Sequence, residues 1–170
     1  MKVRIARPTI EELDGIHSDA LCLFLFEDVR PLKGIAGLVD WRLGAFLSGR
    51  IESGWISCAA GERFILPAGP KLPVTRIFGF GLGPVSGFDP AGHHVAEAFA
   101  VLCDAGAHGA VLTPPGRPEG LVSEMQGLEA VCTALDPALD FDEVVIVDGF
   151  RRREDARRRI DLCLKPLSSS

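Results

Sequence analysis

The feature that most constrains the fold is a set of short segments in which successive residues are apolar. The segment Ala20–Phe26 reads Ala-Leu-Cys-Leu-Phe-Leu-Phe, with no charged residue in it. A strand with one face in water alternates apolar and polar residues, whereas a strand covered on both faces is apolar throughout. The segment therefore predicts a strand inside a sheet that helices cover on both faces. Other strand-like segments, with β-branched and aromatic residues, are Val3–Ala6, Arg63–Leu66, Val74–Phe80, Ala110–Thr113 and Glu143–Val147.

Helical patterns alternate with these segments. Apolar residues recur at intervals of three and four from Ile35 to Ile51, which predicts one amphipathic helix. A second helix is expected to begin with Asp89 as its N-cap and Pro90 at its first position, and to end at Gly106. The third helix follows Pro118, and the fourth runs from about Arg151 to Leu164. The residues expected on the buried face of the third helix are Leu121, Met125, Leu128, Cys132 and Leu135.

This alternation predicts a single α/β domain over residues 1–166, with residues 167–170 as a disordered tail. A length of 170 residues, 47% of them hydrophobic, is enough for one sizeable core. The expected architecture is a three-layer α/β/α sandwich around a mixed sheet.

Composition limits the partners and the location. With 18 basic and 23 acidic residues the net charge is −5, which argues against general binding to nucleic acid or to an anionic membrane. The five cysteines are an odd number and lie far apart in apolar surroundings, as expected of small buried hydrophobes in a reducing compartment. No apolar run approaches the roughly 20 residues of a membrane-spanning helix, and the start lacks the apolar stretch of a secretory signal. A cytoplasmic protein is expected.

Several segments together resemble the N-terminal domain of the leucyl (cytosol) aminopeptidase family. They are Ser18–Phe26, Gly37–Asp40 with Leu43–Leu47, Gly61–Pro67, and Arg76–Gly83, which ends in Gly-Leu-Gly. The resemblance covers nearly the whole chain, and it rests on the order and spacing of the segments. It implies a macro-domain-like α/β/α fold that does no chemistry.

In that family a separate C-terminal domain binds two divalent metal ions and the N-terminal domain decorates a hexamer. Nothing after Leu164 could supply such a metal-binding C-terminal domain, so no catalytic residue, metal ligand or cofactor is expected in this chain. The resemblance implies a free-standing, non-catalytic module for binding or assembly, with a protein partner or a homo-oligomer. A catalytic half encoded as a separate polypeptide is a further alternative.

One candidate ligand cleft is the glycine-rich segment Gly79–Asp89, which joins the expected buried strand to the start of the second helix. Glycine lets a phosphate approach the backbone, and a helix start offers unpaired N–H donors. The spacing departs from Gly-x-Gly-x-x-Gly, and Asp89 would repel a phosphate, so a purely structural turn is the alternative. The chain also contains no asparagine, which macro domains that bind ADP-ribose usually carry after the equivalent of Ala20–Phe26. The candidate cleft residues are Gly79, Gly81, Gly83, Ser86 and Gly87.

One candidate partner surface is a ridge of arginines on the last helix. Its members are Arg152, Arg153, Arg157 and Arg158. Such a ridge can hold an acidic partner protein or a phosphate backbone, and the net charge favours the protein. The alternative is a solvated face with the intrahelical pairs Glu154–Arg158 and Asp155–Arg159. Trp55 and Phe88 are expected as exposed apolar contacts.

The sequence therefore leaves two candidate functions. The first is the assembly module, and the second is a binder of a nucleotide or ADP-ribose-like small molecule. The second would use the glycine-rich cleft and the loop Glu27–Lys33.

Overall fold

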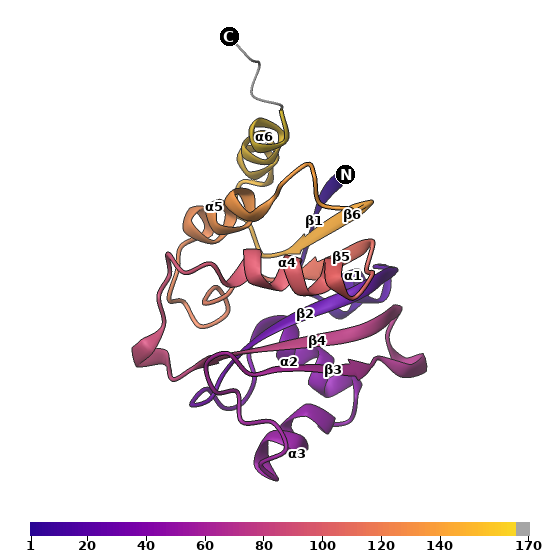
Figure 1. Ribbon diagram of the computed structural model, residues 1–170, viewed down its shortest axis with the longest axis vertical. Helices are drawn as coiled ribbons and strands as arrows, with labels where there is room; N and C mark the ends of the chain where they lie inside the picture. The colour runs from indigo at the N-terminus through magenta and orange to yellow at the C-terminus, as the bar shows by residue number, and fades with distance from the viewer. Residues whose placement is uncertain (166–170) are drawn as a thin grey trace.

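The computed structural model describes residues 1–165, in which one sheet separates two layers of helices (Figure 1). The strands are β1 (Lys2–Ala6), β2 (Ser18–Phe26), β3 (Arg63–Pro67), β4 (Val74–Gly83), β5 (Gly109–Leu112) and β6 (Glu143–Val147). The α-helices are α1 (Ile10–Asp14), α2 (Gly34–Arg42), α3 (Phe46–Glu52), α4 (His94–Asp104), α5 (Glu124–Ala134) and α6 (Arg153–Leu164). Two short 3₁₀ turns, η1 (Gly69–Lys71) and η2 (Val85–Gly87), flank β4.

The six-stranded sheet has the order β1-β6-β5-β2-β4-β3. All neighbours are parallel except β3 and β4, which pair antiparallel, so the sheet is mixed as expected. The apolar strand β2 lies inside the sheet, where Ala20 is opposite Ala110 of β5 and Arg76 of β4. At one edge β1 pairs with β6, and at the other edge β3 is the last strand.

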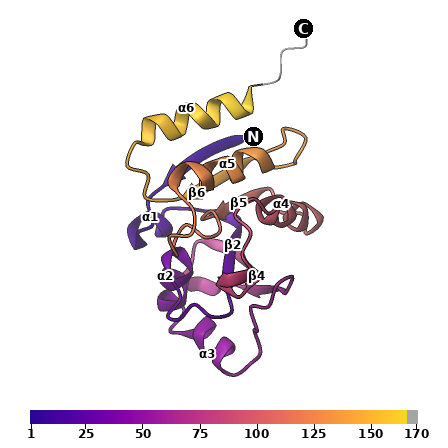
Figure 2. The ribbon, with the colours of Figure 1, turned by 90° about the vertical axis from the view of Figure 1, so that its left-hand side faces the viewer.

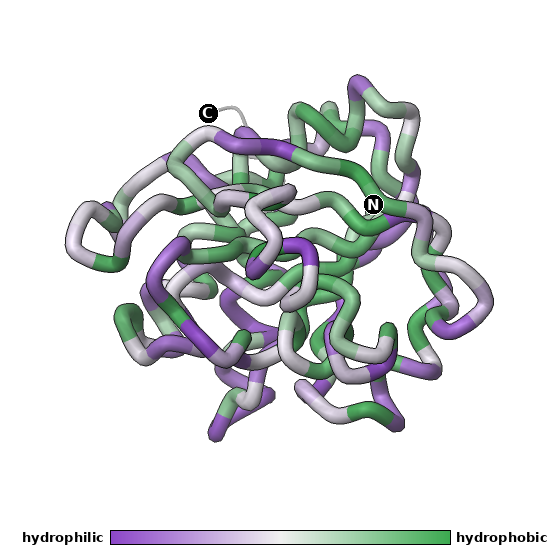
Figure 3. The backbone as a smooth tube through the Cα atoms, turned by 90° about the horizontal axis from the view of Figure 1, so that it is seen from below, coloured by the Kyte–Doolittle hydropathy of each residue, from purple (hydrophilic) through white to green (hydrophobic). Residues whose placement is uncertain are grey.

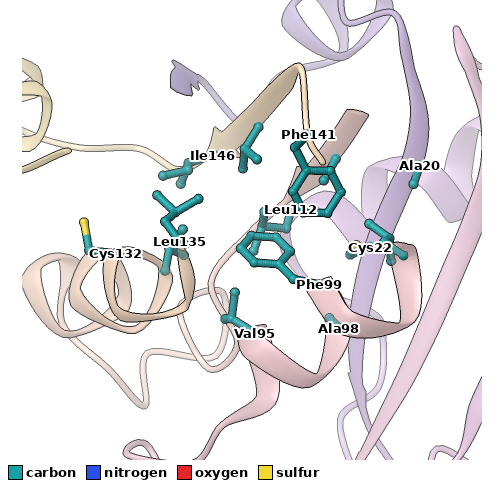
Figure 4. Packing of buried hydrophobic residues seen from close by; sticks show 14 of the residues in the cluster. Ala20, Cys22, Val95, Ala98, Phe99, Leu112, Cys132, Leu135, Phe141 and Ile146 are labelled. Carbon is teal, nitrogen blue, oxygen red and sulfur yellow. The ribbon is translucent and has the colours of Figure 1, made fainter. Parts of the chain in front are cut away.

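Each face of the sheet carries its own apolar core. Helices α1, α2 and α3 pack on one face, around Leu23, Val39 and Leu47. Helices α4, α5 and α6 pack on the other, where Phe99 meets Phe141 edge to face with ring centroids 5.3 Å apart (Figure 4). Figure 2 shows α1 and α2 on one side of the strands and α4 on the other. The tube in Figure 3 is mostly green, that is hydrophobic, through the interior strands. Because helices cover both faces of the mixed sheet, the predicted three-layer α/β/α architecture is confirmed.

The single helix predicted from Ile35 to Ile51 is wrong, because the chain folds as α2 and α3. Gly44 and Ala45 both have positive φ, 67° and 61°, so the helix cannot continue through them. The buried carboxylate of Asp40 near the end of α2 accepts hydrogen bonds from Ser48, from its N–H at 3.1 Å and from its hydroxyl. The Asp40 side chain thus satisfies one N–H of the first turn of α3 and links the two helices.

Helix α4 begins later than predicted. Its N-cap is His93, and Asp89 instead accepts a hydrogen bond from the N–H of Ala91 at 2.9 Å in the turn before it. The predicted end is confirmed, because Gly106 follows the C-cap with a φ of 68°. Residues 84–93 therefore form a longer connection after β4 than the sequence indicates.

The other helices also differ in their details. Ser123 and Gln126 form a capping box at the start of α5, which leaves Leu121 outside the helix. Leu121 and Met125 are exposed, at 37% and 51%, so their expected place on the buried face is wrong. The short helix α1, capped by Thr9, was not predicted. The expected domain boundary at residue 166 and the tail 167–170 lie outside the described residues.

Candidate ligand site at the carboxyl edge of the sheet

The order of the strands creates one place where neighbouring connections diverge. The chain leaving β2 passes through α2, α3 and β3 to β4, while the chain leaving β5 passes through α5 to β6 on the opposite side. Helices α2 and α5 also lie on opposite faces of the sheet. In open α/β sheets, such a divergence leaves a crevice at the carboxyl ends of the two strands, and ligands bind there.

A loop closes this crevice in the present structure. The cavity between β2, the start of α2 and residues 113–119 has a volume of about 10 Å³, which is room for about one water molecule. Pro118 lies against Gly34 so closely that a methyl group on Gly34 would come within 2.7 Å of its Cγ. The residues around the cavity include Lys33, Thr113, Gly116 and Glu119.

Arg117 holds this loop in place. Its Nε and Nη2 donate to the two carboxylate oxygens of Asp148, at 2.7 and 3.0 Å, and its Nη1 donates to the carbonyl of Val122 at 3.0 Å. The hydrogen bond to Asp148 raises the pKa of Arg117 against the effect of its partial burial. A further bond joins the Thr113 hydroxyl to the carbonyl of Val147 at 2.9 Å. The loops after β5 and β6 are therefore tied to each other on the β5 side of the crevice.

The crevice carries opposite charges. Lys33 is the exposed N-cap residue of α2, and its side chain makes no capping bond. Burial raises the pKa of Glu119, and a backbone hydrogen bond and the charge of Lys33 oppose that rise. The carboxylate of Glu119 thus lies in a poorly solvated place beside the exposed cation of Lys33.

An aromatic wall stands on the β4 side of the crevice. Phe88 meets Phe26 edge to face at 5.2 Å and stacks on His94 at 5.5 Å between ring centroids. A methyl group on Gly116 would come within 2.7 Å of the Phe88 ring, so only glycine fits at this position without a shift of the ring. Phe88 is half-buried, and its expected exposure is wrong.

The residues of the predicted glycine-rich cleft do not lie together, because some belong to β4 and others to the turn after it. Gly79 and Gly81 lie within β4, which extends to Gly83. A methyl group on Gly79 would strike the Phe64 ring, and one on Gly81 would come within 2.1 Å of the carbonyl of Ala59. Their lack of a side chain is therefore explained by packing. Gly83 ends β4 with a φ of 73°, and Ser86 and Gly87 are exposed in η2 at the carboxyl edge.

The arginines of α6 are placed unequally. Arg152, Arg157 and Arg158 are exposed, whereas Arg153 is half-buried. The intrahelical pair expected between Asp155 and Arg159 is wrong, because Arg159 pairs with Glu129 of α5 at 2.6 Å. Asp155 instead has Arg152 at 3.9 Å. The partner surface of Arg152, Arg153, Arg157 and Arg158 stays a prediction.

Two general features bear on the class of function. Within residues 1–165 no group of three His, Cys, Asp or Glu side chains is placed to hold a metal ion. None of the helices in that range is long and apolar enough to cross a membrane. The cytoplasmic location expected from the sequence stays a prediction.

The loop residues Arg117, Glu119 and Asp148 were missed as site residues by sequence reasoning. Thr113 and Asp148 directly follow buried strands, and this position was the available signal. Their meeting depends on β5 and β6 being neighbours, which the sequence does not specify.

Comparison with solved structures defines the class of fold as macrodomain-like. The Trypanosoma brucei macrodomain in complex with ADP-ribose matches with a TM-score of 0.68 at 12% identity, covering 96% of this chain and 69% of that chain. The macrodomain of Mycobacterium tuberculosis DarG matches with a TM-score of 0.65 at 15% identity, covering 86% of this chain and 98% of that chain.

A mutant of tomato leucine aminopeptidase matches as well, with a TM-score of 0.66 at 17% identity. The match covers 96% of this chain and 35% of that chain, so this chain spans about a third of that peptidase. No family model and no curated protein matches the sequence. The macro-domain-like fold is therefore confirmed, while membership of the leucyl aminopeptidase family stays a prediction.

Proposed function

We propose that this chain binds a nucleotide or an ADP-ribose-like small molecule at the carboxyl edge of its sheet. The observation that carries the proposal is the crevice between β2 and β5, where the connections diverge to opposite faces. A surface loop fills the crevice, and the apolar cores lie on the two faces of the sheet beside it. A solved structure of the same fold, the Trypanosoma brucei macrodomain, is in complex with ADP-ribose, which supports this class of ligand.

Binding requires the loop 113–121 to move, because a cavity of about 10 Å³ holds no nucleotide. Moving Glu119 away removes a carboxylate that would repel a phosphate. Lys33 and the N–H groups of the first turn of α2 then face the vacated space, and both attract an anion. The predicted residues Gly83, Ser86 and Gly87 lie at the same edge, on the β4 side.

A thermal-shift titration with ADP-ribose, ADP and AMP tests the proposal. A ligand at 100 times its dissociation constant stabilises the native state by about 2.7 kcal/mol, which is a rise of several degrees in Tm. We expect such a rise for at least one of the three, and a weaker one in Lys33→Glu. The matched control is Lys71→Glu, since Lys71 is exposed in η1 and does not line the crevice. No rise with any nucleotide, or an equal rise in Lys33→Glu, would contradict the proposal.

The assembly role expected from the resemblance stays a second prediction, and peptidase chemistry is not part of either function.

A further inference from the structure

An exposed aromatic patch, made by Trp41, Phe46 and Trp55 with Arg50, lies around α3 and the end of α2. The sequence has two tryptophans, Trp41 and Trp55, and they are 69% and 77% exposed. Phe46 is also exposed, and the guanidinium of Arg50 lies over both the Phe46 ring, at 4.9 Å, and the Trp55 ring, at 5.2 Å. Figure 1 shows α3 beside β3, at the end of the molecule opposite α6. Exposed aromatic side chains with arginine are the residues that dominate protein interfaces.

Two adjoining hollows lie beside the patch. A groove of about 330 Å³ runs between Leu43 and Phe46 on one side and Leu66, Pro67 and Pro70 on the other. A neighbouring hollow of about 530 Å³ shares Pro70 and Lys71 with this groove and reaches Trp41. Contiguous apolar surface of this kind marks an interaction site.

The free edge of β3 borders the same groove. In the antiparallel pair with β4, Glu62 accepts a hydrogen bond from Gly81 and Ala68 donates one to Thr75. By the alternation of an antiparallel ladder, the backbone groups of Arg63 and Ile65 point away from β4. No strand in the described range covers them, because β3 is the last strand of the sheet. An extended peptide can therefore add to this edge as a further strand.

Glu62 and Asp14 near the edge already have partners, since Glu62 accepts hydrogen bonds from the N–H groups of Ser57 and Cys58 and Asp14 pairs with Arg42. Within residues 1–165, Arg50, Arg63 and Lys71 have no carboxylate within 4 Å, and Arg63 and Lys71 are exposed. These three unpaired cations occur on a chain whose net charge is −5. It favours a partner that is locally acidic.

The same details disfavour two other occupants. A second copy that docked by the same patch would bring like cations together across the symmetry axis. Single-stranded nucleic acid needs open aromatic faces on which bases stack, but Arg50 already covers a face of both Phe46 and Trp55.

We propose that the β3 edge and the adjoining groove bind an extended acidic segment of another protein. The segment pairs with the outward backbone groups of Arg63 and Ile65. Its carboxylates face Arg63 and Lys71, and an apolar side chain enters the groove between Phe46 and Pro67.

Intrinsic fluorescence tests this directly, because both tryptophans belong to the patch and the chain has no tyrosine. The probes are a capped decapeptide of alternating leucine and glutamate, its leucine and lysine counterpart, and a ten-nucleotide thymidine oligomer. We expect a saturable change in emission with the glutamate peptide at low salt, and at least about ten-fold weaker binding of the lysine peptide.

Two variants separate backbone pairing from charge. Ile65→Pro removes an outward N–H and no bond to β4, so the fold is kept while the glutamate peptide binds about five- to ten-fold more weakly. Ile65→Val is the matched control and keeps wild-type binding. If Ile65→Pro lowers the Tm, the double variant Arg63→Glu/Lys71→Glu, which changes exposed residues, is used instead. We expect it to bind the glutamate peptide at least about ten-fold more weakly than the wild type.

Four results would overturn the proposal. They are equal binding of the glutamate and lysine peptides, unchanged binding in the charge-reversed double variant, tighter binding of the oligonucleotide than of the glutamate peptide, and an emission change that depends on protein concentration alone. The last would identify a second copy as the occupant.

Discussion

Arg117 donates hydrogen bonds to both carboxylate oxygens of Asp148, from Nε at 2.7 Å and from Nη2 at 3.0 Å, although the two residues belong to different loops. The pair is largely removed from water, with side-chain exposures of 17% for Arg117 and 7% for Asp148. A two-point contact of this kind fixes orientation as well as distance. It determines how the loop after β5 lies over the crevice between β2 and β5.

Removing the cation of this pair should destabilise the fold strongly. Arg117→Leu leaves the carboxylate of Asp148 buried without its partner, and breaking a buried pair in this way costs about 3–5 kcal/mol. Urea denaturation measures the loss. Arg151→Leu is the matched control, because Arg151 is 92% exposed and should contribute less than about 0.5 kcal/mol. Similar losses for the two variants would show that the Arg117–Asp148 pair does not hold the loop.

Replacing Glu119 with glutamine should stabilise the protein in a pH-dependent way. Because burial raises the pKa of Glu119 in the folded state, the folded protein binds a proton more readily than the unfolded chain. Its contribution is thus full below the unfolded pKa and is lost as the pH rises through the folded pKa. We expect Glu119→Gln to have a higher Tm than the wild type at pH 7, and the difference to vanish near pH 4.

Thermal melts at the two pH values check this expectation. Glu52→Gln serves as the control, because Glu52 is exposed at the end of α3 and its replacement should leave the Tm nearly unchanged at both pH values. A gain at pH 4 as large as that at pH 7 would contradict the assignment.

The two kinds of glycine in the predicted cleft should respond differently to alanine. In Gly81→Ala the new methyl group would lie 2.1 Å from the carbonyl oxygen of Ala59, and the backbone must move to admit it. We expect a loss of about 2–3 kcal/mol in the free energy of unfolding. In Gly87→Ala the nearest atom is Cγ of Pro84 at 3.9 Å, so the change should be within about 0.5 kcal/mol. Equal effects in chemical denaturation would contradict the packing explanation.

Cys22 should be unreactive in the native protein. It lies within β2 and is 1% exposed, and burial raises its pKa to about 12. The thiolate is the reactive form, so a thiol-specific disulfide reagent at pH 8 should leave Cys22 unmodified until the chain is unfolded in urea. Mass spectrometry of the labelled peptides identifies the site. Rapid modification of Cys22 without denaturant would show that the centre of the sheet opens.

Much of the sheet could be predicted because its signals are local. The apolar run Ala20–Phe26 indicates an interior strand, and the structure places it in β2. The helix from Ile35 to Ile51 could not be predicted correctly, since the apolar period continues across Gly44 and Ala45 while the backbone there turns left-handed. That turn is stabilised by a contact between Asp40 and Ser48, which the period of apolar residues does not reveal.

The candidate site was less accessible to sequence reasoning. The glycines from Gly79 to Gly83 suggested a turn with a ligand cleft after the strand, whereas β4 continues to Gly83. Gly79 and Gly81 lack a side chain because the Phe64 ring and the carbonyl of Ala59 occupy that space. The crevice itself depends on strand order, and strand order depends on long-range pairings that no local motif encodes. Arg117 and Asp148 become partners only once β5 and β6 lie side by side.

The pairing of β1 with β6 has a consequence for the order of folding. Among residues 1–165, the only strand partner of residues 2–6 is the segment 143–147. During synthesis the first strand must therefore wait until nearly the whole domain has left the ribosome, and closing so long a segment is slow. Until then the first strand is unpaired and β5 has a free edge, and a nascent chain would expose both of these strand edges, which β6 covers in the finished protein.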